Sequence, residues 1–306
     1  MAALDNTVLA ENIAAAQDIE MVQNFKGDVD RLSEILGIFG AEVVAAGTTM
    51  YQYSVTGTLN ATTVAEGDEV PLSEYTVTKT PVTSITVKPY RKLTTAQAIL
   101  KGGYENAIAK TDRKMISQVR NGILTDFFTF MATGTGTATG KGLQDAFAQG
   151  DAELRDAMET NGDSSDAFVH FVNPFDIAGY LGKAAITTQT VFGMQYIESF
   201  LGVENVFVTN KVAKGTMYVT PVDNIHLYGV DFAALGDAGL AYTAQNGSLI
   251  GVHHTPAYNR TSAETYVLTG ALMLAEIKDY IVKVTVGDAD PIDVSVVGTV
   301  TTEASS

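Results

Sequence analysis

Apolar residues recur every three or four positions between residues 104 and 131, which is the spacing of one face of an α-helix. The recurring residues are Ile108, Met115, Ile116, Val119, Ile123, Leu124, Phe127, Phe128 and Met131. Lysine, arginine and amide side chains occupy the opposite side of this segment. About 28 residues at about 1.5 Å each form a rod of about 42 Å, which exceeds the usual helix length of about 8–20 residues. We therefore predict one long helix, stopped by a flexible, threonine- and glycine-rich link at residues 133–142.

A short helix is predicted immediately before this rod. Thr94 and Gln97 have the spacing of a capping box, so the helix would begin there and continue to Lys101. The paired Gly102 and Gly103 are unfavourable in a helix interior. The sequence therefore predicts a short helix, a glycine joint and then the rod.

Upstream of these helices, apolar and polar residues alternate with the period of β-strands. The alternation covers residues 51–56, then 75–78, and again 85–88. Residues 59–73 lie between the two arms and are polar, acidic and interrupted by glycine and proline, as expected of a loop. An isolated two-stranded ribbon is only marginally stable in water. We therefore expect this ribbon to lie on another copy of the chain.

Residues 1–46 have the character of an arm. They contain helix-compatible stretches, and Asp28 is placed to cap a short helix. The segment has too little apolar surface to fold alone, so we expect it to pack across other elements or another subunit. Deletion of residues 1–30 is then expected to leave the subunit folded.

The second half of the chain predicts a compact domain of mixed helix and sheet. Within residues 142–275, helical and strand patterns alternate, and Asn173 followed by proline suits the start of a helix. Two further strands are predicted at 265–274 and 277–286, and the second is expected to return beneath the rod. A final strand is predicted at 293–300.

Composition narrows the class of protein. The chain has 306 residues, of which 46% are hydrophobic, so it is large enough to bury a substantial core. No apolar run of about 18 residues predicts a membrane span, and the N-terminal residues lack the pattern of a secretory signal. The sequence contains no cysteine, which excludes disulfides, thiolate metal sites and cysteine nucleophiles.

Charge is unevenly distributed along the chain. The net charge of −16 disfavours a general affinity for DNA phosphates. Residues 88–120 nevertheless contain eight basic and two acidic residues, whereas residues 59–77 contain acidic residues and no basic one. Either both are simply solvated surfaces, or the acidic loop of one subunit docks on the basic rod of a neighbour. The candidate interface residues are Glu66, Asp68, Glu69, Glu74, Arg91, Lys92, Arg113 and Lys114.

Motifs for catalysis or cofactor binding do not emerge. The segment near residue 140 does not match the phosphate-binding loop motif. Thr135 occupies the position of the first glycine, and Gly142 occupies the position of the serine or threonine. The histidines are not spaced as metal ligands are, and we expect them to be structural. They are His170, His226, His253 and His254. An acidic cluster fits a solvated turn better than a cation site: Asp288, Asp290 and Asp293. We therefore predict no catalytic residue, no metal ligand and no cofactor, and expect a protein that is not an enzyme.

The order of these parts resembles a known family. Glu66-Gly67 is followed by Val70-Pro71, by alternating strands, by Arg91-Lys92-Leu93-Thr94-Thr95 and by a long helix that ends before glycines. This order resembles the major capsid proteins of tailed bacteriophages, which have the Hong Kong 97 fold. No single motif carries the resemblance, which covers nearly the whole chain.

The resemblance implies an α+β fold with five parts. Residues 1–46 would be the N-terminal arm, 47–93 the extended β-hairpin loop, and 94–133 the peripheral domain with its spine helix. Residues 134–275 would form the axial α/β domain. Residues 276–306 would supply the closing strands of the peripheral domain and the C-terminal tail.

The resemblance also implies a structural role in the virion. Copies would form hexamers and pentamers that close into an icosahedral shell around double-stranded DNA, without sequence-specific binding and without a membrane. Assembly would take place in the cytoplasm of a host bacterium. Because the chain begins in arm-like sequence, we expect a separate scaffolding protein, together with a portal and, in some relatives, decoration proteins. The alternatives are an encapsulin-type compartment with protein cargo, and a soluble enzyme or binding domain with an incidental hairpin.

Overall fold

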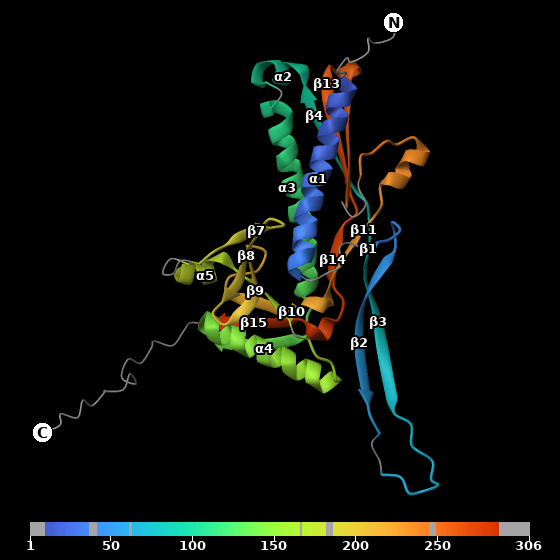
Figure 1. The fold of residues 1–306 in the computed structure, drawn as a ribbon, viewed down its shortest axis with the longest axis vertical. Coiled ribbons are helices and arrows are strands. Elements are labelled where there is room, and N and C mark those ends of the chain that lie inside the picture. Colours follow the sequence, from blue (N-terminus) through green and yellow to red (C-terminus); the bar gives the residue numbers. More distant parts are fainter. Residues whose placement is uncertain are drawn as a thin grey trace, which may run out of the picture.

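The molecule is elongated, and its two ends carry different elements (Figure 1). In the computed structural model, a ribbon of β2 (Thr49–Thr58) and β3 (Glu74–Ser84) projects at one end. The opposite end carries β4 (Lys88–Thr95) and α2 (Ala96–Gly102). The residues that the structure describes are 10–36, 42–60, 63–103, 105–165, 167–181, 186–244 and 249–287.

Helix α3 (Lys110–Met131) is the predicted rod, and the π-helical turn η1 (Glu105–Ala109) precedes it. Its predicted apolar face is buried at Ile116, Val119, Ile123, Leu124, Phe127, Phe128 and Met131. Helical periodicity therefore identified both the helix and its core-facing side.

The short helix and the glycine joint are also confirmed. Helix α2 is capped by Thr95, whose hydroxyl oxygen accepts a hydrogen bond from the Ala98 N–H at 3.3 Å. The predicted cap, Thr94, is one residue too early, because the side chain of Thr94 is buried and the exposed Thr95 caps the helix. Gly103 ends the helix with a φ of 74°, in the region that favours glycine.

The arm is where the structure departs most from expectation. Helix α1 (Ala10–Leu36) is one continuous helix of 27 residues that lies along α3 and the nearby sheet. Its apolar stripe is fully buried in the main core of the same chain: Val22, Phe25, Val29 and Leu32. Asp28 lies inside this helix, where it pairs with Arg120, and is not a cap. The expectation that this segment packs across other elements is confirmed, and because α1 is part of the core, removal of residues 1–30 is now expected to destabilise the subunit.

A seven-stranded mixed sheet forms the broad part of the molecule, in the order β5-β15-β10-β6-β9-β8-β7. Its strands are β5 (Gly136–Lys141), β6 (Phe168–Val172), β7 (Gln189–Val191), β8 (Met194–Phe200), β9 (Val203–Val208), β10 (Thr216–Pro221) and β15 (Val282–Gly287). Helix α4 (Gly142–Asn161) packs on one face, and the C-terminal half of α3 packs on the other, with the Phe127 and Phe171 rings 5.5 Å apart. Helix α5 (Pro174–Leu181) begins as predicted, because Asn173 Oδ1 accepts a hydrogen bond from the Phe175 N–H at 2.9 Å.

Two sequence predictions are corrected by this sheet. Residues 136–141 are not a flexible link but form β5, which pairs in parallel with β15. Its glycines are required by close packing, since a Cβ on Gly140 would collide with the backbone of Ala146. Strand β15 also pairs with β10 and packs against α4, whereas β14 packs against the predicted rod α3.

Two three-stranded sheets complete the body. One has the order β12-β13-β4, and the other the order β1-β11-β14. Their remaining strands are β1 (Glu42–Val43), β11 (Ile225–Gly229), β12 (Ile250–Ala257), β13 (Ser262–Thr269) and β14 (Leu272–Ala275). The described residues also form short 3₁₀ turns, which are η2 (Val222–Asn224), η3 (Ala233–Ala238), η4 (Tyr258–Arg260) and η5 (Lys278–Tyr280). The single strand predicted at 265–274 is thus two strands in different sheets. The predicted alternation at 85–88 does not extend the ribbon, because β4 leaves it to pair with β13.

Some predictions concern residues outside the described ranges. These are the strand at 293–300, the cluster of Asp288, Asp290 and Asp293, and the tail beyond residue 287. The five-part division of the chain stays a prediction.

Candidate assembly surface

Three hydrogen bonds fasten the described part of the ribbon to the body near the base of the ribbon. There the Gln52 side chain donates to the Ala275 carbonyl at 3.1 Å, and the Ser54 hydroxyl donates to Asp279 at 2.6 Å. The Tyr53 N–H donates to the Glu276 carbonyl at 3.1 Å. Beyond this anchor the two strands extend away from the body (Figure 1). The outer ribbon is therefore available to another molecule.

Large apolar side chains are exposed on this outer part. Leu72 is 93% exposed, and Tyr75 and Val77 are each 59% exposed. Leu59 and Val70 are exposed beside them. Singly exposed apolar residues are ordinary, but a contiguous group on a projecting ribbon marks an interaction surface.

The acidic candidates lie in the same outer part of the ribbon. Glu66, Asp68, Glu69 and Glu74 are all exposed, and they lie at or next to the turn of the ribbon. Gly67 makes this turn with a φ of 94°, and the Asp68 N–H donates to the Ala65 carbonyl at 3.1 Å. The structure thus brings all four predicted acidic residues together at one end of the molecule.

Two of the basic candidates already have partners in their own chain. Arg91 makes two hydrogen bonds to Glu264, at 2.5 and 3.1 Å, which raises the pKa of Arg91 and lowers the pKa of Glu264. Lys92 pairs with Asp112 and donates to the Thr111 hydroxyl at 2.6 Å. Bidentate arginine–carboxylate pairs are geometrically specific, so Arg91 has a role in fixing β4 to β13.

Arg113 and Lys114 lie exposed near the start of α3. Figure 1 places this helix end beside α2, at the opposite end of the molecule from the turn of the ribbon. The acidic and basic candidates therefore cannot meet within one chain. Contact between them in two different chains stays a prediction.

A buried charge cluster links α1, α3 and β12, and sequence reasoning missed it. His254 lies between Asp18 and Asp112, with its Nε2 3.1 Å from Asp112 Oδ2, and all three side chains are buried. Burial would lower the pKa of His254, but hydrogen bonds to Asp112 and Asp18 outweigh it and raise the pKa to about 9. Burial of Asp112 is likewise outweighed by hydrogen bonds from His254 and Lys92, so its pKa is lowered.

The other histidines have ordinary structural surroundings. His170 Nε2 lies 2.7 Å from Asp151, and His226 Nε2 lies 3.0 Å from Glu276. The His253 ring contacts Tyr242, with the ring centroids 6.0 Å apart. Within the described ranges, no group of three or more histidine, cysteine or acidic residues is arranged to hold a metal ion. No described helix is long and apolar enough to cross a membrane.

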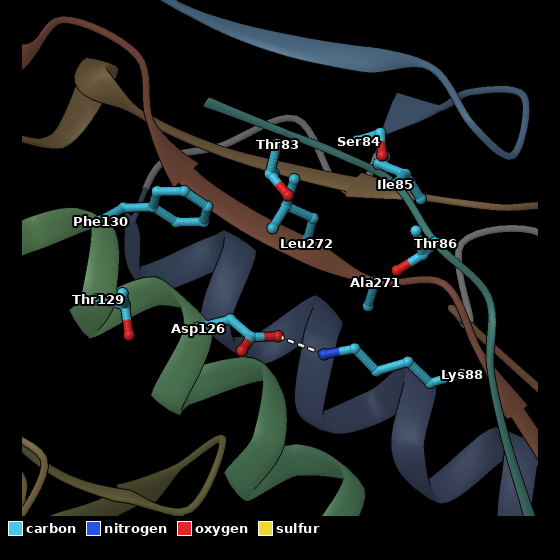
Figure 2. Close-up of a pocket in the computed structure, with 10 residues that line it drawn as sticks. All are labelled: Thr83, Ser84, Ile85, Thr86, Lys88, Asp126, Thr129, Phe130, Ala271 and Leu272. Atoms are coloured by element: carbon cyan, nitrogen blue, oxygen red, sulfur yellow. Dashed lines mark hydrogen bonds and ion pairs between the residues drawn. The ribbon is translucent and has the colours of Figure 1, made fainter. Parts of the chain in front are cut away.

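A pocket of about 270 Å³ lies between the end of the ribbon, α3 and β14 (Figure 2). It is lined by Thr83, Ser84, Ile85, Thr86, Lys88, Asp126, Thr129, Phe130, Ala271 and Leu272. Its two charged groups, Lys88 and Asp126, form an ion pair at 2.6 Å. They neutralise each other, so the lining does not favour an ionic ligand.

We compared the sequence and the fold with those of known proteins. No protein-family profile and no curated protein matches the sequence. The capsid structure of the cyanophage P-SCSP1u matches with a TM-score of 0.51 and 8% identity, over 84% of this chain and 88% of that one. The capsid of Gordonia phage Cozz gives 0.49 at 13% identity, covering 83% and 86% of the two chains. The holo-SrpI encapsulin complex from Synechococcus elongatus gives 0.48 at 10% identity, covering 82% and 86%.

The fold assignment depends on the first of these matches. It spans most of both chains and shows that this protein has the α+β architecture of a phage capsid subunit, as the Hong Kong 97 resemblance implied.

Proposed function

We propose that this chain is the major capsid protein of a tailed bacteriophage. Its copies would assemble into an icosahedral shell that encloses double-stranded DNA, so its role would be structural and not enzymatic. The observation that carries the proposal is the ribbon, which projects from a capsid-type fold with an exposed group of apolar and acidic side chains.

The physics of the ribbon supports assembly. The ribbon contributes little to a single subunit, because its outer strands bury almost no side chain there. A contact between unlike ends of identical molecules is head-to-tail, and such contacts form rings when the rotation closes. Rings of this kind correspond to the pentamers and hexamers of a shell.

The charge of the chain fits a container for DNA. At −16, the subunit as a whole repels phosphate, which suits a wall that encloses DNA without binding it tightly. In this proposal a scaffolding protein, a portal and decoration proteins are the further partners. The assembled protein belongs to the virion and is built in the bacterial cytoplasm.

Assembly of the purified chain tests the proposal. The chain is expressed in a bacterium without other phage genes and analysed by sedimentation velocity and negative-stain electron microscopy. The expected result is large particles or curved sheets of many copies. A chain that remains monomeric at all accessible concentrations, both alone and when expressed with its scaffolding protein, would contradict the proposal. Particles that form together with an enzyme from a neighbouring gene, and that enclose it, would favour the encapsulin-type compartment.

A further inference from the structure

The strand register divides the ribbon into two chemically different faces. Side chains of directly opposed residues lie on the same face, and successive residues alternate between faces. Tyr51 is opposite Pro81, Tyr53 opposite Lys79, and Gly57 opposite Tyr75. We call this side the tyrosine face, and it consists of Tyr51, Tyr53, Gly57, Tyr75, Val77, Lys79 and Pro81. The other side, the hydroxyl face, consists of Gln52, Ser54, Thr56, Thr58, Glu74, Thr76, Thr78 and Thr80.

The body of the subunit anchors the ribbon through the hydroxyl face. The side chains that reach the body at the base are Gln52 and Ser54, which bond to Ala275 and Asp279. Within the tyrosine face, Lys79 Nζ lies 3.8 Å from the centre of the Tyr51 ring. Tyr75 and Val77, further out, are mostly exposed. Tyr51 and Tyr53 are half-buried at the base, and the outer part of the tyrosine face is exposed from Gly57 and Tyr75 onward.

The two faces differ in what burial would cost. Removing Tyr75 and Val77 from water is favourable because it buries apolar surface. Covering the threonines would require a hydrogen-bond partner for each hydroxyl, since an unpaired buried polar group is unfavourable. If one face is covered in an assembly, these energetics select the tyrosine face.

The occupant that fits is a second copy of this chain. The ribbon ends in acidic residues, and the opposite end of the molecule carries the exposed basic residue Lys114 on α3 and the exposed Leu100 on α2 (Figure 1). Those two ends can meet only between copies, where opposite charge favours the contact.

The size of the face also points to repeated copies. Eleven residues of β3 at about 3.4 Å each give a face about 37 Å long. With two strands about 5 Å apart, its area is a few hundred Å², below the ~800 Å² per partner of a stable pair. A single ribbon contact would be too weak alone, whereas in a ring every copy both gives and receives one.

We propose that the tyrosine face docks on a second copy of this chain and that the hydroxyl face stays in water. This inference rests on the proposed shell function and adds which side of the ribbon the neighbour covers.

Cysteine accessibility tests it directly, because the natural chain contains no cysteine. Val77→Cys and Thr76→Cys place thiols on adjacent residues and opposite faces. Maleimide labelling is timed for dissociated subunits and for particles made only of this chain. The expected result is at least a tenfold slower labelling at position 77 on assembly, and less than a twofold change at position 76.

A second set of four variants tests the energetic cost of a charge on each face. Val77→Glu and Val77→Lys are compared with Thr76→Glu and Thr76→Lys by sedimentation. Both charges at position 77 are expected to reduce the assembled fraction at least tenfold, and both at position 76 less than twofold. Using both signs separates loss of the apolar contact from simple repulsion.

The outcomes separate this inference from the proposed function. If wild-type particles form but position 77 is still labelled freely, or position 76 alone becomes protected, the inference is overturned and the shell function stands. Protection of position 77 that needs a different added protein would overturn it in the same way. If the wild-type chain never assembles, the shell function fails and this inference fails with it.

Discussion

The aromatic ring of Tyr75 lies across Gly57 on the facing strand. The two residues are directly opposed, and a Cβ on Gly57 would collide with the Tyr75 ring. A glycine in a strand interior normally weakens it, but here the ring covers the exposed backbone, an arrangement known as aromatic rescue. The pair holds the tyrosine side chain flat along the ribbon.

Gly57→Val should therefore disturb assembly without unfolding the subunit. The new side chain would displace the Tyr75 ring from the tyrosine face, and the outer ribbon contributes little to the core. We expect the melting temperature of the dissociated subunit to change by less than about 2 °C, and the concentration needed for assembly to rise several-fold. Thr56→Val, which changes the other face, is the matched control. Unchanged assembly of the Gly57 variant would show that the ring position does not matter.

Reversal of the acidic residues at the ribbon turn tests the charge contact. The triple variant Glu66→Lys, Asp68→Lys and Glu69→Lys should weaken assembly while the subunit stays folded, because all three side chains are exposed. Assembly of the wild type should also weaken as salt rises, since charges are screened over about 8 Å at 0.15 M. Particles that form normally from the triple variant would show that these charges do not guide docking.

His254 predicts a loss of stability at alkaline pH. Its pKa is about 9 in the folded chain, above the unperturbed value of 6.5, so the folded state holds its proton more tightly. The stabilisation is complete below pH 6.5 and is lost as pH rises through 9. Allowing for screening and for coupling to Asp18, Asp112 and Lys92, we expect a decrease of about 1–2 kcal/mol in unfolding free energy.

Urea unfolding between pH 6 and 10 measures this effect. His254→Gln should be less stable at neutral pH and should lose the pH dependence in this window. His253→Gln, at the neighbouring position, should keep both close to the wild type. A wild-type unfolding free energy that is flat between pH 6.5 and 9 would contradict the assigned protonation.

Phe25→Ala tests the role of α1. Phe25 is fully buried and packs edge-on against Phe192, with ring centroids 5.8 Å apart. Its truncation should cost about 3–5 kcal/mol of unfolding free energy. Asn24→Ala, one residue away and exposed, should change it by less than about 0.5 kcal/mol. A small effect at Phe25 would instead support a detachable arm.

The strongest sequence signals were those with a clear period. The 3.6-residue repeat through Phe127 identified α3, and strict alternation around Tyr53 and Val77 identified the ribbon. Both patterns depend only on neighbours within the same element, so they are visible in one sequence.

The missed features depend on distant partners. Strand β5 was mistaken for a link because its glycines and threonines resemble a flexible segment, and the residues that Gly136 packs against, Ile281 and Val282, lie far along the chain. His254 is 236 positions from Asp18 and 142 positions from Asp112 in the sequence, so no local pattern predicts that the three residues form a cluster. The interior of α1 was missed because its apolar stripe lies among many small and polar residues.

The short segment that anchors the ribbon has a mechanical consequence. Residues 275–279 hold Gln52, Tyr53 and Ser54, and the chain then continues within a few residues into β15, an interior strand of the seven-stranded sheet. A force that pulls on the ribbon is therefore transmitted to a hydrogen-bonded sheet and not to a flexible loop, so the ribbon is connected rigidly to the body.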